Sequence, residues 1–263
     1  MTVSELSPPT ALPLSVAQAK AYCRADGSDE DSIFTGLIRA AVAAIESEAG
    51  RFLVTRTAQL NLPRFPYSSS VRHYLLDDVN GRILLPKSPV WNVTGISYLD
   101  GDQSSQTWSS SEWSLRAGND PDAIEADADY CFPSTYPSDS AVTVTYQAGY
   151  AAPVSVDAVA NTITCTNRTL ANGDRFRLTT QGTLPTGLSV DTDYYAVSAS
   201  GMTCQVSATL GGGAIGFAGG SGQHFMGEVP PAILAALQLM IVHLFEARDG
   251  QKPAPSIGYL LET

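Results

Sequence analysis

The chain has 263 residues and a formal net charge of −11, and 16% of its residues are charged. This length is enough to bury one large core or two modest ones. The acidic balance and the lack of a Lys/Arg cluster exclude a groove that binds nucleic acid, because phosphate recognition requires clustered basic side chains. Met1–Leu14 lacks the features of a secretion signal, so we expect synthesis in a reducing cytoplasm.

Two helices are predicted in the N-terminal part of the chain. Ser15 is the expected N-cap of a helix over Leu14–Arg24. The second helix begins at Asp31, ends before Gly50 and carries apolar residues at three- and four-residue spacing. These apolar residues are Ile33, Phe34, Leu37, Ile38, Ala41, Val42 and Ile45.

After Gly50 the pattern of apolar residues changes from helical to alternating, which predicts a small antiparallel β region. The stretch Gly118–Asp139 contains three prolines and is expected to be loop. The expected strands lie within Val54–Leu62, Gly81–Val90, Val93–Leu99, Trp108–Leu115 and Ala141–Tyr146.

Residues Ala151–Glu228 differ in composition, with 12 of the 22 glycines and no lysine. Short strand-like segments separated by Asn-Gly and Ser-Gly turns predict a compact all-β module. Asn172–Thr180 and Thr192–Tyr195 resemble a small β module of phage virion proteins. The expected strands are Thr162–Thr166, Arg175–Thr179, Tyr194–Ser198 and Thr203–Ser207.

Four cysteines show no metal or redox spacing. Cys165 and Cys204 could face each other on neighbouring strands of this module, but the pattern favours two small buried side chains. We therefore expect neither a zinc site nor a redox pair.

A C-terminal helix is predicted over Pro231–Arg248, with proline in its first turn and Gly250 after its end. Its apolar run, within Ile233–Phe245, is too short to span a bilayer and predicts a buried helix. The apolar face comprises Ile233, Leu234, Leu237, Met240, Ile241, Leu244 and Phe245. The tail that follows has two prolines and four large apolar residues, which a purely solvated terminus would rarely carry.

No motif in the sequence predicts catalysis or a cofactor. Gly211, Gly213 and Gly216 match a dinucleotide fingerprint, but no helix can follow them, so a β loop is favoured. None of the histidines (His73, His224, His243) lies near a nucleophile motif or a second metal ligand. We expect a protein that is not an enzyme and that has no catalytic residue, cofactor or metal.

A string of acidic residues invites a calcium interpretation, yet it lacks the glycine and the flanking helices of an EF-hand. A solvated loop, or a loop facing a channel, is favoured. The string comprises Asp120, Asp122, Glu125, Asp127 and Asp129.

Several segments occur in a recognisable order. Leu14–Lys20 precedes an acidic turn and the helix from Asp31, and Leu85–Val90 precedes Val93–Asp100. The strand Ala141–Tyr150 reads as continuous with Val229–Arg248 once the residues between them are removed. This order resembles the head–tail adaptor (connector) proteins of long-tailed bacteriophages and gene transfer agents, over roughly residues 12–150 and 229–250.

The resemblance implies an α+β adaptor fold, a helical bundle with a small antiparallel β region, here carrying an inserted all-β module. It implies a structural protein of the virion neck that forms a ring, usually of twelve copies, docks on the portal and extends the DNA channel. The implied partners are other copies of the chain, the portal, a stopper or tail-terminator protein, and DNA that passes without specific binding; no membrane is involved. It does not separate a phage from a gene transfer agent.

On this resemblance, an extended tail would dock on the portal through Pro253, Pro255, Ile257, Tyr259, Leu260 and Leu261. Helix packing would rest on Ile33, Leu37, Val42, Leu237, Ile241 and Phe245.

The expected domains are 1–150, the inserted module 151–228, and 229–263 with the last helix and tail. Deleting 151–228 is expected to leave a folded protein that still forms rings. The alternative function is virion decoration or binding of a host glycan or receptor through the insert. In that case Tyr194, Tyr195 and Phe217 would form a sugar platform, although they more simply fill the β core.

Overall fold

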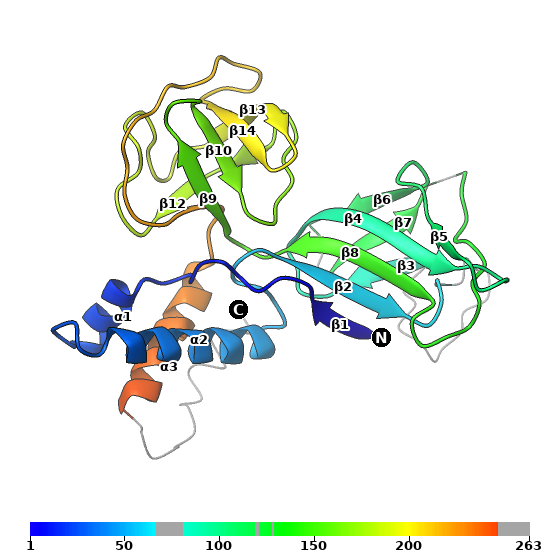
Figure 1. The fold of residues 1–263 in the computed structure, drawn as a ribbon, viewed down its shortest axis with the longest axis horizontal. Coiled ribbons are helices and arrows are strands. Elements are labelled where there is room, and N and C mark those ends of the chain that lie inside the picture. The colour runs from blue at the N-terminus through cyan, green and yellow to red at the C-terminus, as the bar shows by residue number, and fades with distance from the viewer. Residues whose placement is uncertain (67–80, 119–120, 128, 247–263) are drawn as a thin grey trace. The chain divides into compact units, whose positions relative to one another are not determined.

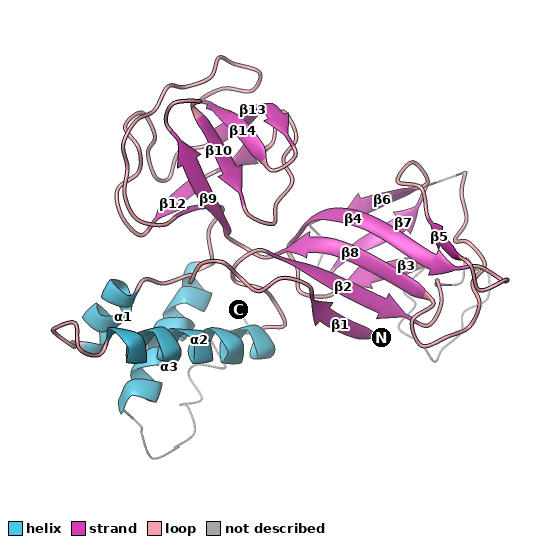
Figure 2. Ribbon diagram, viewed as in Figure 1, coloured by secondary structure: helices cyan, strands magenta, loops and turns pink. Residues whose placement is uncertain are grey.

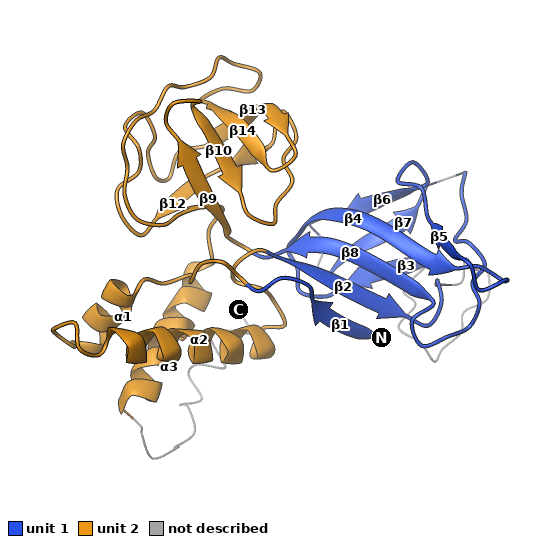
Figure 3. Cartoon of the chain, viewed as in Figure 1, with its two compact units in different colours: residues 1–8, 56–149 blue, residues 9–55, 150–263 orange. Residues whose placement is uncertain are grey.

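The computed structural model describes residues 1–66, 81–118, 121–127 and 129–246. Within these residues the chain forms fifteen β-strands in three sheets and three α-helices (Figure 2). The chain divides into two compact units, one of residues 1–8 and 56–149 and the other of residues 9–55 and 150–263 (Figure 3). The predicted helical bundle with a small β region is therefore wrong, because strands dominate the fold.

The three helices have 8, 18 and 16 residues, so only two of them are long enough to contribute a bundle-like face. The strand content was underestimated because several strands have no alternating apolar pattern. The unpredicted strands of the described chain are β1 (Thr2–Glu5), β5 (Ser105–Thr107), β7 (Asp122–Ala126), β9 (Ala152–Asp157) and β15 (His224–Met226). Strand β7 lies in the stretch expected to be loop, where acidic residues argue against a strand.

The first unit contains two antiparallel sheets (Figure 1). The five-stranded sheet has the order β1, β2 (Arg56–Leu62), β8 (Val142–Ala148), β4 (Val90–Leu99) and β5 (Ser105–Thr107). The three-stranded sheet has the order β3 (Arg82–Leu85), β7 and β6 (Trp113–Arg116). Because β8 is central, its alternate side chains Val142, Val144 and Tyr146 are fully buried.

A buried carboxylate ties β7 to the start of β4. Asp122 is 2% exposed, and its Oδ2 accepts a hydrogen bond from the Val90 amide at 2.7 Å. Its Oδ1 accepts one from the Gly118 amide at 2.8 Å, and its own amide donates to Ser88 Oγ at 3.0 Å. The carboxylate therefore satisfies two backbone donors that would otherwise lose their partners.

The second unit contains all three helices, α1 (Val16–Cys23), α2 (Asp31–Glu48) and α3 (Pro231–Glu246). The predicted N-cap is confirmed: Gln18 N donates to Ser15 Oγ at 3.2 Å, and Ser15 N donates to Gln18 Oε1 at 2.9 Å. Within the part of the chain that the structure describes, no helix is both long and apolar enough to cross a membrane.

The second unit also contains a seven-stranded antiparallel sheet, built entirely from residues of the predicted insert. Its order is β11 (Arg175–Phe176), β13 (Tyr194–Ser200), β14 (Thr203–Ser207), β10 (Thr162–Cys165), β9, β15 and β12 (Leu178–Thr180). Strands β11 and β12 lie at opposite edges, although only Arg177 separates them in the sequence. The sheet must therefore curl until its edges approach, as in a nearly closed barrel.

The two cysteines of this module lie in its core. Cys165 is 1% exposed and Cys204 is fully buried, and both are free thiols. The Cys165 Sγ donates to Met226 Sδ at 3.5 Å. Burial raises the pKa of Cys165 to about 12 and that of Cys204 to about 11. The prediction of small buried side chains is confirmed for both residues.

Candidate functional site

In the helices of the second unit, five of the six residues predicted to pack lie in the helical core or against it. Leu237 and Ile241 on α3 are fully buried, Val42 on α2 is 8% exposed, and Leu37 packs against the same core. Ile33 is instead 50% exposed. The buried position predicted for Ile33 is occupied by the next residue of the helix.

That neighbour is Phe34, which is fully buried and stacks on Phe245 with ring centroids 5.0 Å apart. The spacing of apolar residues on α2 allowed either side chain to face inward. Packing against the aromatic ring on α3 selected Phe34.

The predicted portal-docking residues, Pro253, Pro255, Ile257, Tyr259, Leu260 and Leu261, lie outside the described residues. The same is true of Arg248 and Gly250 at the predicted end of the last helix, of His73 and of Asp120. The docking tail therefore stays a prediction.

The two ends of the predicted insert lie together within the second unit. Strands β9 and β15 pair antiparallel, with Ala152 opposite Met226. A Cβ at Gly227 would collide with the carbonyl oxygen of Tyr150, and Gly227 has φ +92°, so only glycine fits there. The Tyr150 amide in turn donates to the Phe52 carbonyl at 3.1 Å. The two ends of the module are thus neighbours.

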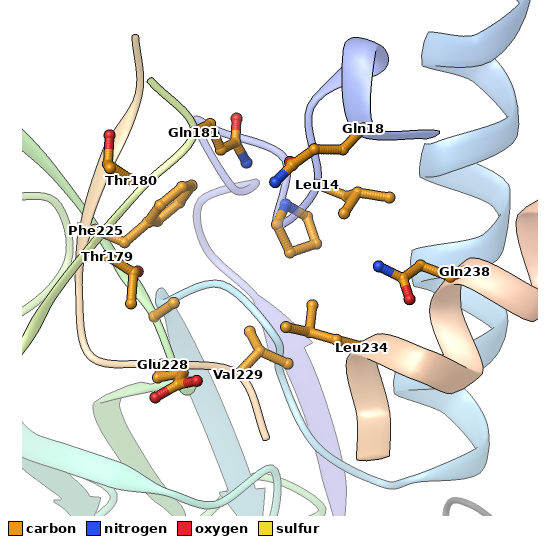
Figure 4. A pocket seen from close by; sticks show the side chains of 12 residues that line it. Leu14, Gln18, Thr179, Thr180, Gln181, Phe225, Glu228, Val229, Leu234 and Gln238 are labelled. Atoms are coloured by element: carbon orange, nitrogen blue, oxygen red, sulfur yellow. The ribbon is translucent and has the colours of Figure 1, made fainter. Parts of the chain in front are cut away.

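A pocket of about 180 Å³ lies in the second unit beside this junction (Figure 4). Its apolar wall combines Leu14 before α1, Phe225 from β15, and Val229 and Leu234 around the start of α3. All four belong to the helical core or pack against it, so the wall is part of that core.

Polar side chains complete the lining. Figure 4 shows the Gln18 and Gln238 amides facing the pocket from α1 and α3. The Gln181 amide donates to the Leu12 carbonyl at 2.8 Å, which ties the β module to the segment before α1. Glu228 is the charged residue of the lining and is acidic.

The volume is below the range typical of pockets for small-molecule ligands. The acidic residue makes the pocket a poor match for a phosphate. Sequence reasoning did not identify this pocket. The one available signal was Gln238, which interrupts the apolar face of the last helix.

The acidic string does not form one site. Asp122 is the buried backbone acceptor described above, whereas Glu125 on β7 pairs with Arg82 and Arg116. The hydrogen bond from Arg116 is the main cause that lowers the pKa of Glu125. Two of these residues therefore stabilise the small sheet, which corrects the expectation of a solvated or channel-facing loop for this part of the string.

The remaining candidate residues are the histidines and the glycines of the dinucleotide-like spacing. His224 lies on β15 with its Nδ1 2.7 Å from Thr180 Oγ1, and burial lowers its pKa. His243 lies on α3. Among the described residues, no group of three or more His, Cys, Asp or Glu side chains is placed to hold a metal ion. Gly211, Gly213 and Gly216 lie in the irregular segment between β14 and β15, which has no helix.

The aromatic residues proposed as a sugar platform are mostly internal. Tyr194 is 3% exposed and Phe217 is 4% exposed, and both belong to the core of the β module. Tyr195 alone of the three is only partly covered. The simpler interpretation, that these rings fill the core, holds for Tyr194 and Phe217.

Comparison with known proteins gives matches in structure only. No protein-family model and no curated protein matches the chain. A chain in the neck of an empty gene transfer agent (GTA) particle, computed with C6 symmetry, matches with a TM-score of 0.57 and 17% identity. A chain in the virion of a native GTA particle matches with a TM-score of 0.56 and 17% identity. Each match covers 100% of this chain and 94% of the other, so it spans the insert as well as its flanks. This chain therefore shares the fold of chains found in GTA particles.

Proposed function

We propose that the protein is a structural component of the neck of a virion, in a tailed phage or a gene transfer agent. The observation that carries the proposal is the fold likeness to a GTA neck chain over the whole length of this chain. A fold alone does not imply a function. The order of sequence segments that resembles head–tail adaptors supports the same location independently.

Within the neck, we infer the role of a head–tail adaptor. Copies of the chain form a ring, dodecameric as in the family it resembles, and the tail at 253–261 docks on the portal. The net charge of −11 per copy favours passage of DNA, because a negative lumen repels phosphates and prevents adhesion. A lumen lined by lysine and arginine would contradict this role.

The location and the ring are tested on assembled particles. Cryo-electron microscopy of particles that contain this chain should place it between portal and tail as a closed ring. Light scattering of the purified chain, alone and with portal protein, should show whether the ring requires the portal. Particles whose neck density excludes this fold would end the proposal.

The role of the tail is tested with matched substitutions. Tyr259→Ser combined with Leu260→Ser should weaken capture by immobilised portal protein at least tenfold, because apolar anchors dominate such interfaces. Val159→Ser is the control, since Val159 is 95% exposed and lies in the insert. Equal capture of both variants would exclude the tail as the docking element.

The insert is tested by removing residues 152–226 and joining Ala151 to Gly227. Ala152 and Met226, the first and last residues removed, are opposite each other in the β9–β15 pairing, so the residues on either side of the deletion lie close together. Ala151 is retained because it belongs to the helical core, but the deletion also removes Phe225 from that core, so circular dichroism must first show that the variant folds. If the variant that lacks residues 152–226 still enters the neck, the adaptor function resides in the residues on either side of the insert. Loss of host attachment by otherwise complete particles would favour the alternative function in receptor binding.

A further inference from the structure

The N-terminal strand β1 is attached to the first unit without contributing to its core. It pairs antiparallel with β2 at the edge of the five-stranded sheet, with Val3 opposite Leu60 and Ser4 opposite Gln59 (Figure 1). All four of its side chains are exposed. The pairing therefore rests on main-chain hydrogen bonds and not on burial of apolar surface.

Polar contacts fix the register of this strand. Glu5 Oε1 lies 2.6 Å from Arg56 Nη1, and the Arg56 side chain is 4% exposed while that of Glu5 is 43% exposed. The Leu6 amide extends the pairing by donating to the Thr57 carbonyl at 2.9 Å. The edge of β2 is thus a specific pairing site for a strand that carries a carboxylate at the position of Glu5.

The connection between β1 and the rest of the chain passes from one unit to the other. The boundary falls between Pro8 and Pro9, so the strand belongs to the first unit and the next residue to the second. Two consecutive prolines favour an extended linker, because each fixes its φ angle and lacks an amide donor. A strand joined in this way can pair with β2 of its own chain or with β2 of another copy, and it makes the same contacts in both cases.

We propose that the β2 edge is an interface between copies of this chain, in which β1 of one copy pairs with β2 of its neighbour. The exchanged strand makes the same hydrogen bonds and the same Glu5–Arg56 ion pair, so exchange costs no contact. An edge that would otherwise be filled within one molecule then links two molecules. The proposal deepens the proposed ring by naming a contact between copies, and it requires neither the tail nor the insert.

Disulfide trapping with two different chains tests the exchange. Cys23 and Cys131 are first replaced by serine, because the two other native thiols are buried. One chain then carries Ser4→Cys and the other Gln59→Cys, and both are co-expressed with portal protein. Exchange predicts an oxidised dimer that contains one chain of each kind, identified by mass spectrometry of the linked peptides.

Two controls make each outcome decisive. Ser4→Cys and Gln59→Cys in a single chain should close within or between copies and so verify the register. Ser4→Cys in one chain with Thr107→Cys in another should give no dimer, because Thr107 lies on β5 at the opposite edge of the sheet. Rings without a mixed dimer would overturn the exchange alone, whereas monomers without a mixed dimer would overturn both the exchange and the ring.

Discussion

Replacement of Asp122 by alanine should destabilise the first unit strongly. The carboxylate accepts hydrogen bonds from the amides of Val90 and Gly118 at 2.7 and 2.8 Å in a position that is 2% exposed. Alanine leaves both amides without their acceptor, at about 1–3 kcal/mol for each orphaned donor. The free energy of unfolding should therefore fall by about 2–6 kcal/mol. With a urea m-value of about 2 kcal/mol per molar, the midpoint should move down by about 1–3 M.

Tryptophan fluorescence isolates this effect, because all three tryptophans of the chain, Trp91, Trp108 and Trp113, belong to the first unit. Urea unfolding of Asp122→Ala is compared with that of Asp139→Ala, which removes an exposed carboxylate from the same unit. The control should stay within about 0.5 kcal/mol of the native chain. Equal midpoints for the two variants would refute the structural role of Asp122.

The remaining predictions concern the second unit. Leu237→Ala should cost about 2–5 kcal/mol because the side chain is fully buried, whereas Leu239→Ala on the same helix, 45% exposed, should cost less than about 1 kcal/mol; urea unfolding followed by circular dichroism compares them. Burial lowers the pKa of His224, so on acidification the unfolded chain binds a proton at a higher pH than the folded chain does. The folded state should therefore have its full stability above about pH 6.5 and should lose stability as the pH falls below this value. A midpoint that is less sensitive to pH in His224→Asn than in the native chain would support this, and equal sensitivity would contradict it. Cys165 and Cys204, with pKa values of about 12 and 11, should resist thiol reagents at pH 8 until denaturant is added, and rapid labelling of either would show that the β module opens.

Local patterns were sufficient for many elements. Ser15 and Gln18 specify a capping box through contacts three residues apart, and the structure forms it. The prediction of strand Thr203–Ser207 is confirmed with the same bounds. These features depend on neighbours in the sequence, so their residues alone were enough to predict them.

Sites made by distant segments were not predictable in the same way. Asp122 is recognisable as a structural acceptor only because the start of β4, 32 residues earlier, brings a backbone amide to it. The pocket beside the insert requires α1, α3 and β15 to meet, and of its lining residues only Gln238 left a trace in the pattern. Ile33 and Phe34 satisfy the helical period equally, and the ring of Phe245 distinguishes them.

The sequence by itself determined the helix starts, the change of composition between Tyr150 and Val229, and the order of elements that resembles a head–tail adaptor. Composition and turn residues act locally, so the features that depend on them can be predicted from the sequence. Only the tertiary structure decided that the fold is mostly β, that the seven-stranded sheet curls until its edges approach, and that the insert begins and ends at one point. These properties arise from strand pairing between residues far apart in the chain, which no local pattern specifies.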